Sequence, residues 1–195
     1  MPSAGEAALS KSGAFPNMSV MSDRALLIKG EHDVLNEDFN HGVEDMLAEP
    51  VISDALLQHS IQSLCMELVD FCRITKTYYT EIKSMKDNSM SPQDAYKLAH
   101  VIFENYIEEG SSLEVNIEEK MRLRLLTKDS EEVYVGLEDD AKANLFEDAE
   151  REVIKLVHEN LMNSFKRSTL YTEAKERLLS ARKHLEDEEA VGGLL

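Results

Sequence analysis

Apolar residues recur every three to four positions over most of this chain, which is the spacing of one face of an α-helix. Four segments show this spacing well, at about residues 60–83, 91–110, 140–167 and 168–185. Their apolar stripes are Ile61, Leu64, Cys65, Leu68, Cys72, Thr75 and Tyr79; Ala95, Leu98, Ala99, Ile102, Phe103, Tyr106 and Ile107; Leu145, Phe146, Ala149, Val153, Leu156 and Val157; and Tyr171, Ala174, Leu178, Ala181 and Leu185. Residues 133–135 are the only strand candidate, and the run is too short. The pattern therefore predicts an all-α protein, built as a multi-helix orthogonal or bundled domain.

Ser91 and Pro92 mark one predicted helix start, because serine is a good N-cap and proline is pre-set for the first helical position. Gly110 predicts the end of the same helix. Pro50 divides residues 43–57 into two short helices, since proline disrupts a helix interior. The remaining expectations are a helix after Glu118, a break within 160–163, and connectors at 84–90 and 128–140.

A length of 195 residues favours a single domain. Residues 1–20 carry Pro and Gly among Ser and Ala, which predicts a flexible N-terminal arm. We place a helical domain at residues 21–187. We expect a flexible tail at 188–195, where Gly-Gly follows an acidic run.

The formal net charge is −17, with 38 acidic and 21 basic residues, which also fits simple solubility. This sign disfavours nucleic acid and anionic lipid as partners, and no apolar run is long enough to insert into a membrane. We see no signal peptide. Cys65 and Cys72 lie roughly 10 Å apart along one predicted helix, too far for a disulfide. We expect a cytoplasmic protein with free thiols, and the oligomeric state stays open.

The motifs that carry enzyme chemistry are absent from the sequence. There is no glycine-rich phosphate loop, and no histidine has a partner at metal-ligand spacing. Asp87 opens a stretch similar to a calcium loop, but Pro92 stands where that loop requires glycine. We therefore predict no catalytic residue, no cofactor and no metal. The protein is expected to act by binding other proteins rather than as an enzyme.

Three blocks of sequence carry a family resemblance. The first joins MLAEP at 46–50 to ELVDF at 67–71, and the second joins IFENYI at 102–107 to LEVNI at 113–117. The third contains LFEDAEREV at 145–153, followed by SFKRS at 164–168 and Leu-Tyr at 170–171. In composition, spacing and order these blocks resemble the regulator-of-G-protein-signalling (RGS) family, over residues 42–172.

The resemblance implies a fold of about nine helices that includes a four-helix bundle. It also implies binding to the switch regions of a Gα subunit in its GTP-bound or transition state, and faster GTP hydrolysis. Members of the family donate no catalytic group: they hold the switches in a transition-state-like geometry while Gα supplies its own glutamine and arginine. The alternative is an RGS-like interaction scaffold without GTPase-activating (GAP) activity.

Four residues fit the contact positions that the resemblance implies. Asn116 stands where a family asparagine lies against the switch and its water-orienting glutamine. Glu67, Leu156 and Asn160 match an acidic, an apolar and a small polar contact. Three of them have a plainer interpretation: Asn116 as a helix cap, Glu67 on a solvated helix face, and Leu156 in the core.

Three further contact positions depart from the family pattern. Leu68 replaces an asparagine, Ser164 replaces an arginine, and Ser63 replaces an acid. Each departure removes a hydrogen bond worth about 1 kcal/mol, or more where a charge is involved. Leu68 also continues an apolar stripe, which indicates either burial or an altered partner surface.

Overall fold

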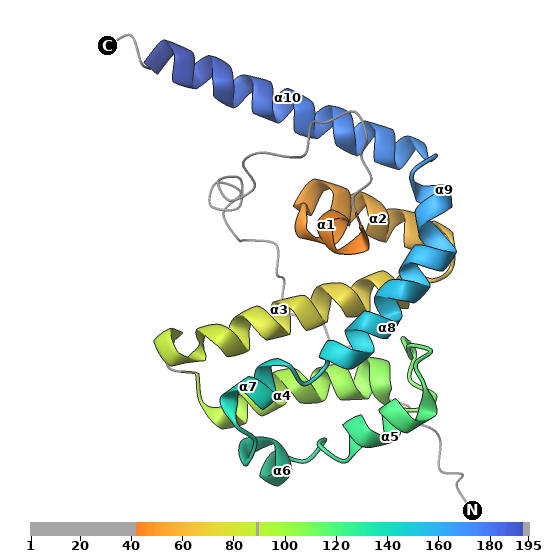
Figure 1. Cartoon of the computed structure of the whole chain (residues 1–195), viewed down its shortest axis with the longest axis vertical. Coiled ribbons are helices and arrows are strands. Elements are labelled where there is room, and N and C mark those ends of the chain that lie inside the picture. Colours follow the sequence, from red (N-terminus) through yellow and green to blue (C-terminus); the bar gives the residue numbers. More distant parts are fainter. Residues whose placement is uncertain (1–41, 89, 193–195) are drawn as a thin grey trace, which may run out of the picture. The chain divides into compact units, whose positions relative to one another are not determined.

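The part of the chain that the structure describes, residues 42–88 and 90–192 of a computed structural model, is built from helices (Figure 1). In chain order these are α1 (Val43–Ala48), α2 (Pro50–Gln62), α3 (Met66–Asn88), α4 (Pro92–Ile102), η1 (Phe103–Ile107), α5 (Glu119–Leu126), α6 (Glu131–Val135), α7 (Asp139–Ala143), α8 (Glu147–Val157), η2 (His158–Met162), α9 (Asn163–Phe165) and α10 (Thr169–Gly192), where η denotes a π-helix. The all-α prediction is confirmed. The predicted arm at 1–20, residues 21–41 of the predicted domain and residues 193–195 lie outside the described residues.

Two of the helices continue directly through a π-helical segment. α4 runs into η1, and α8 runs through η2 into α9. Counted as continuous helices, the described residues contain nine: α1, α2, α3, α4–η1, α5, α6, α7, α8–η2–α9 and α10. This is the number that the family resemblance implies.

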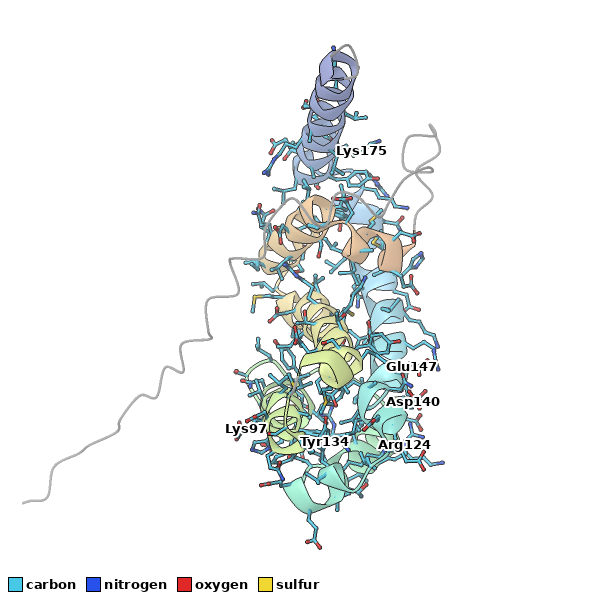
Figure 2. All side chains as sticks on the ribbon, turned by 90° about the vertical axis from the view of Figure 1, so that its left-hand side faces the viewer. Lys97, Arg124, Tyr134, Asp140, Glu147 and Lys175 are labelled. Carbon is cyan, nitrogen blue, oxygen red and sulfur yellow. The ribbon has the colours of Figure 1, made fainter. Side chains whose placement is uncertain are left out.

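Four of these helices, α3, α4–η1, α5 and α8, form a four-helix bundle. α3 packs against both α4 and α8, and α5 packs against η1. An ion pair of 2.7 Å between Arg124 of α5 and Asp148 of α8 joins the fourth pair of neighbours (Arg124 is labelled in Figure 2). Aromatic rings fill the interior, where Phe103 and Phe146 lie 5.1 Å apart between ring centroids and both are buried.

α1, α2 and α10 form a second layer beside this bundle. α2 packs against α3 on one side and against α10 on the other (Figure 1). Tyr171, Ala174 and Leu178 are buried, which confirms the first part of the stripe predicted after residue 168. The helix α10 continues to Gly192, so residues 188–192 are helical where the sequence predicts a tail.

The predicted helix ends that rest on capping chemistry are confirmed. Pro50 is the first residue of α2, and Pro92 is the first residue of α4. The hydroxyl of Ser91 accepts a hydrogen bond of 3.1 Å from the backbone N–H of Asp94, as an N-cap does. Gly110 has a positive φ of 79° and follows the end of η1, as expected for a helix stop.

The single helix predicted at 60–83 is wrong: a corner at residues 63–65 divides it into α2 and α3. Leu64, at this corner, has a φ of 57°. α3 then runs to Asn88, through the predicted connector at 84–90. The corner occupies about one helical turn of sequence, so the apolar spacing continues across it and conceals the break. After the corner the buried face passes through Leu68, Phe71, Cys72, Thr75, Tyr78 and Ile82, while Tyr79 is exposed.

The acidic connector predicted at 128–140 also contains a helix, α6, and with it the strand candidate at 133–135 proves helical. Tyr134 of α6 is completely buried, and its hydroxyl lies 2.7 Å from that of Tyr78. Tyr78 donates its own hydrogen to the carbonyl of Lys142 at 2.8 Å, so Tyr134 is the donor in the tyrosine pair. The acidic segment is thereby anchored in the core through one aromatic side chain.

His100 on α4 links that helix to the start of the same segment. Its Nδ1 lies 2.9 Å from a carboxylate oxygen of Asp129, and its Nε2 lies 3.4 Å from Glu104. Its ring stacks on Tyr96 with a centroid distance of 5.4 Å. The hydrogen bond to Asp129 raises the pKa of His100 above its ordinary value of 6.5; burial opposes the shift, and the charges of Asp129, Glu104 and Glu108 reinforce it.

We expect this pair to stabilise the fold at acidic pH and to lose its effect as the pH rises. A folded-state pKa above the unfolded value means that the contribution is complete below about pH 6.5, the ordinary histidine pKa, and disappears as the pH passes the raised folded value. Urea unfolding at pH 6 and pH 8.5 should show a smaller loss of unfolding free energy in His100→Gln than in the unaltered protein. Equal losses would contradict the assignment.

Candidate partner-binding site

Asn116 lies at the centre of a short turn in the loop before α5. Val115 and Ile117 on either side are buried, and Asn116 is exposed. The N–H of Ile117 donates to the carbonyl of Val115 at 3.0 Å, which closes a three-residue turn around Asn116. The N-cap of α5 is Glu118, so the interpretation of Asn116 as a helix cap is wrong. Within the described residues the Asn116 side chain makes no hydrogen bond, and the residue is exposed to solvent.

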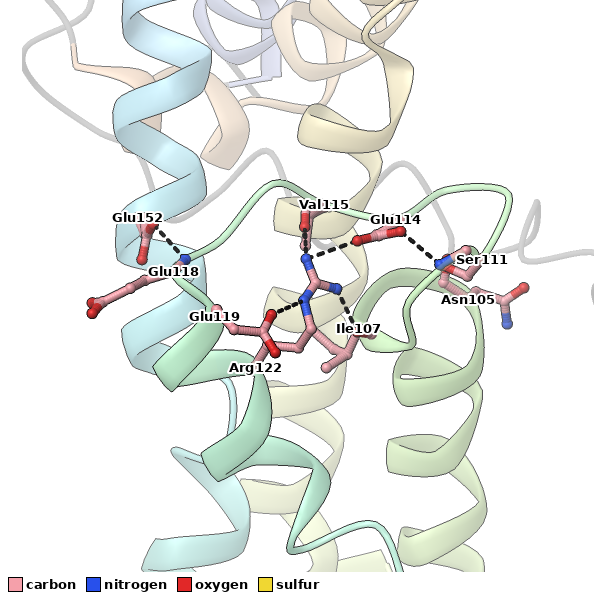
Figure 3. Close-up of polar contacts among 10 residues, drawn as sticks. Asn105, Ile107, Ser111, Glu114, Val115, Glu118, Glu119, Arg122 and Glu152 are labelled. Carbon is pink, nitrogen blue, oxygen red and sulfur yellow. Dashed lines mark hydrogen bonds and ion pairs between the residues drawn. The ribbon is translucent and has the colours of Figure 1, made fainter.

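A buried arginine, Arg122 of α5, holds this turn from inside (Figure 3). Its side chain is only 7% exposed. One terminal nitrogen donates to the carbonyl of Ile107 at 2.6 Å, and the other donates to the carbonyl of Val115 at 3.0 Å. Carboxylates of Glu114 at 2.9 Å and Glu119 at 3.5 Å balance the charge. The guanidinium therefore joins the end of η1 to the residue before Asn116.

Glu114 connects the outer part of the same loop to Arg122. Its second carboxylate oxygen accepts a 2.7 Å hydrogen bond from the backbone N–H of Gly110. Ser111 also donates its hydroxyl hydrogen to the carbonyl of Asn105 at 2.9 Å. These contacts give the whole loop a defined shape within the chain itself (Figure 3).

Glu152 of α8 fixes the loop at its other end. The N-cap residue of α5, Glu118, makes no capping hydrogen bond with its own side chain. Its backbone N–H instead donates to the carboxylate of Glu152 at 2.9 Å, which is a favourable place for an anion. Leu156 and Asn160 follow Glu152 at intervals of four residues, one helical turn each. Leu156 is half-buried and Asn160 is exposed.

The π-helical segment η2 keeps Ser164 on the same face of the helix as Glu152, Leu156 and Asn160. Three α-helical turns take about 11 residues, so residues 12 apart in a regular helix have rotated away from each other. A π-helical turn accommodates one extra residue, which brings Ser164 back to the face of Glu152. The predicted break within 160–163 corresponds to this change of helix type rather than to an interruption.

Ser164 connects α9 to the end of α2. Its hydroxyl donates to the carbonyl of Leu161 at 2.9 Å and lies 2.8 Å from Nε2 of His59. Because the serine hydrogen is already used, His59 donates from Nε2 to the serine oxygen. Ser63 follows one turn after His59, as the exposed C-cap of α2. The serine at 164 is thus committed to an internal contact.

At the start of α3, Glu67 and Leu68 differ in their surroundings. Glu67 is half-buried in the first helical turn, where a negative charge is favourable. Leu68 is only 5% exposed, and its side chain belongs to the core. Of the two outcomes that the apolar stripe allows for Leu68, the structure therefore shows burial, and its side chain is not available as a surface contact.

Sequence reasoning missed Leu64, which it placed in a buried stripe. Leu64 is 92% exposed and has a φ of 57°, in the left-handed region. That backbone costs an L-residue about 1–2 kcal/mol, and such strain clusters at functional sites. Sequence reasoning also missed Arg122, because an arginine in a helix of mixed charge gives no signal of burial.

Leu64, Glu67, Asn116, Leu156 and Asn160 define a candidate docking surface, referred to below as the docking surface, and they come from three segments. The Glu118–Glu152 hydrogen bond joins the loop before α5 to α8, and the His59–Ser164 hydrogen bond joins α9 to α2 near the α2–α3 corner. In Figure 1 these segments lie along the right-hand edge of the helical domain.

Shallow pockets open on a different face of α8, lined by residues that include Tyr79, Glu150 and Ile154. Two residues apart on an α-helix differ by more than half a turn, so Glu150 and Ile154 face away from Glu152 and Leu156. Burial raises the pKa of the Glu150 carboxyl. Within the described range no three metal-binding side chains gather closely enough to hold an ion. These pockets are therefore lined by a different face of α8 from the one that carries Leu156.

The family model of the Regulator of G protein signaling domain matches residues 43–174, more than half of the chain. The protein therefore belongs to the RGS family, whose members are regulators of G-protein signalling rather than classical enzymes. No curated protein matches the chain. Of the helices described, none combines the length and the apolar character that crossing a membrane requires.

We predict that Leu64→Asn leaves the protein as stable as before or raises its unfolding free energy by up to about 1 kcal/mol, because asparagine tolerates the left-handed conformation. The loss of an almost fully exposed side chain removes little packing. Ile61→Asn, at a 49% exposed position inside α2, is the matched control and should be neutral or destabilising. Denaturant unfolding measures both. A clear destabilisation by Leu64→Asn would show that this side chain supports the fold.

Proposed function

We propose that this protein binds the switch regions of a Gα subunit in its GTP-bound or transition state and accelerates GTP hydrolysis, which terminates the signal. The observation that supports it most is the exposed amide of Asn116, held on a prefolded loop directly beside α8. Because the loop is already ordered, binding does not have to fix it, and less affinity is lost to conformational entropy. The family match over residues 43–174 supplies the kind of partner.

In this proposal the protein restrains Gα and takes no chemical part in the reaction. Asn116 offers one donor group and one acceptor group to a mobile switch, and Asn160 offers the same from η2. Leu156 and Leu64 supply apolar contact. Gα supplies the magnesium ion, the glutamine that orients water and the arginine that stabilises the transition state. Acceleration then comes from holding the switches in the geometry of the transition state.

An RGS-like scaffold without GAP activity is the second candidate function. The burial of Leu68 favours the scaffold function, because this leucine of the core stands where the family implies a contact asparagine. A second contact is lost at Ser164, which stands where the family implies an arginine and whose hydroxyl is hydrogen-bonded to His59. With Ser63 in place of an acid, three hydrogen bonds of about 1 kcal/mol each are missing, which amounts to a hundredfold or more in affinity if they add.

Single-turnover GTP hydrolysis by candidate Gα subunits, with and without this protein, distinguishes the two functions. We expect acceleration, and we expect Asn116→Ala to reduce it at least tenfold, the effect of about 1.4 kcal/mol at the transition state. Asn144→Ala is the matched control, because Asn144 is also exposed but caps α7 beside the pockets. It should leave the rate unchanged.

A binding measurement against Gα carrying GDP and aluminium fluoride, which mimics the transition state, completes the test. Binding without acceleration would establish the scaffold function. Neither binding nor acceleration would reject both functions for the subunits tested. Equal losses in Asn116→Ala and Asn144→Ala would reject the assigned surface while leaving the activity in place.

A further inference from the structure

Burying a guanidinium in a helix as short as α5 is energetically unfavourable if the side chain only fills space. Removing such a charge from water costs several kcal/mol, and an apolar side chain of similar volume often serves the core as well or better. Arg122 is nevertheless only 7% exposed. Its presence is therefore explained by what its hydrogen bonds hold, and not by packing.

Those hydrogen bonds reach two carbonyls that the local secondary structure leaves without helical partners. The carbonyl of Ile107 ends η1, and terminal carbonyls of a helix lack intrahelical donors. The carbonyl of Val115 accepts Arg122 at 3.0 Å while it also accepts the N–H of Ile117 at 3.0 Å. Both lone pairs of that oxygen are thus used, and the turn around Asn116 is fixed from two directions.

Arg122 cannot reach a bound partner itself. Its side chain is enclosed by the loop, while Asn116 stands on the outer surface. Any effect of Arg122 on partner binding has to pass through the shape of the turn. Glu114 supports the same arrangement, since its two carboxylate oxygens contact Arg122 at 2.9 Å and the N–H of Gly110 at 2.7 Å.

We propose that Arg122 is a positioning residue that fixes the turn carrying Asn116, and that it governs the proposed GAP activity without touching the partner. The inference rests on the proposed function. Lysine at this position carries its donors on a single nitrogen, so it does not reproduce the planar fork in which two separate nitrogens each donate to a different carbonyl. Arginine is thus required for its geometry as well as its charge.

Hydrogen exchange of the backbone amides tests the turn without any partner. In Arg122→Met, which keeps an unbranched apolar side chain, we expect the amides of Val115 and Ile117 to exchange at least tenfold faster. Buried amides of α3 should keep their protection, which shows that the bundle is intact. Arg124→Met, which removes the exposed arginine of α5, is the matched control and should change neither. Unchanged exchange at the turn in Arg122→Met would overturn the proposal.

The activity measurement distinguishes positioning from a general loss of stability. With saturating protein, Arg122→Met should lower the maximal rate of GTP hydrolysis about as much as Asn116→Ala does. The double variant should have a maximal rate no lower than that of either single variant, because both changes remove the same contact, that of Asn116 with the partner. Arg122→Lys should fall between Arg122→Met and the unaltered protein.

Failure of the inference is distinguishable from failure of the proposed function. Full acceleration by Arg122→Met would overturn the inference alone, and so would losses that simply add in the double variant. Absence of acceleration by the unaltered protein would reject the proposed function, while the exchange measurement still decides whether Arg122 holds the turn. Should Arg122→Met fail to fold, Glu114→Gln replaces it, with faster exchange at Gly110 and Val115 expected; unchanged exchange at both would overturn the inference.

Discussion

Backbone groups at the ends of helices lack partners within the helix, and in this protein side chains from neighbouring elements supply them. Arg122 donates to the carbonyl of Ile107 at the end of η1, and Glu152 accepts from the backbone N–H of Glu118, the N-cap of α5. At each of these points the same side chain also fixes a segment that reaches the docking surface. The requirement to satisfy helix ends is therefore what turns a set of packed helices into a surface of defined shape.

The candidate site is assembled from separate segments at the surface of the helical domain. Its parts are the end of one helix, a short loop and one face of another helix, each held by a charged or polar contact of 3.0 Å or less. The helices beneath are packed around buried aromatic rings, and in most complexes of prefolded proteins the interface backbone moves little on binding. In the proposed function, this surface recognises Gα by its shape and by a few hydrogen bonds.

The fold could be predicted from the sequence where one residue type has one dominant effect. Pro50, Ser91 and Pro92 set helix starts by local chemistry, and the sequence shows them directly. The corner at Leu64 could not be predicted, because apolar spacing continues across a break of one turn. The burial of Tyr134 could not be predicted for another reason: this single aromatic side chain anchors an acidic segment that otherwise has the composition of a loop.

The candidate site also has parts that the sequence indicates and parts that it does not. Asn116, Glu67, Leu156 and Asn160 were found only through the family resemblance, which transfers positions and carries no information about burial. It therefore could not show that Leu68 is in the core. Arg122 acts through distances to two carbonyls, and these exist only after folding. Local chemistry can be predicted from sequence, whereas contacts that depend on several helix ends cannot.

The most direct test of the docking surface is a map of amide chemical shifts in the isotope-labelled protein as Gα with GDP and aluminium fluoride is added. We expect changes centred on Leu64, Asn116 and Asn160, with the opposite face of α8 at Glu150 and Ile154 unaffected. Binding that perturbs Glu150 and Ile154 and leaves Asn116 unchanged would contradict it.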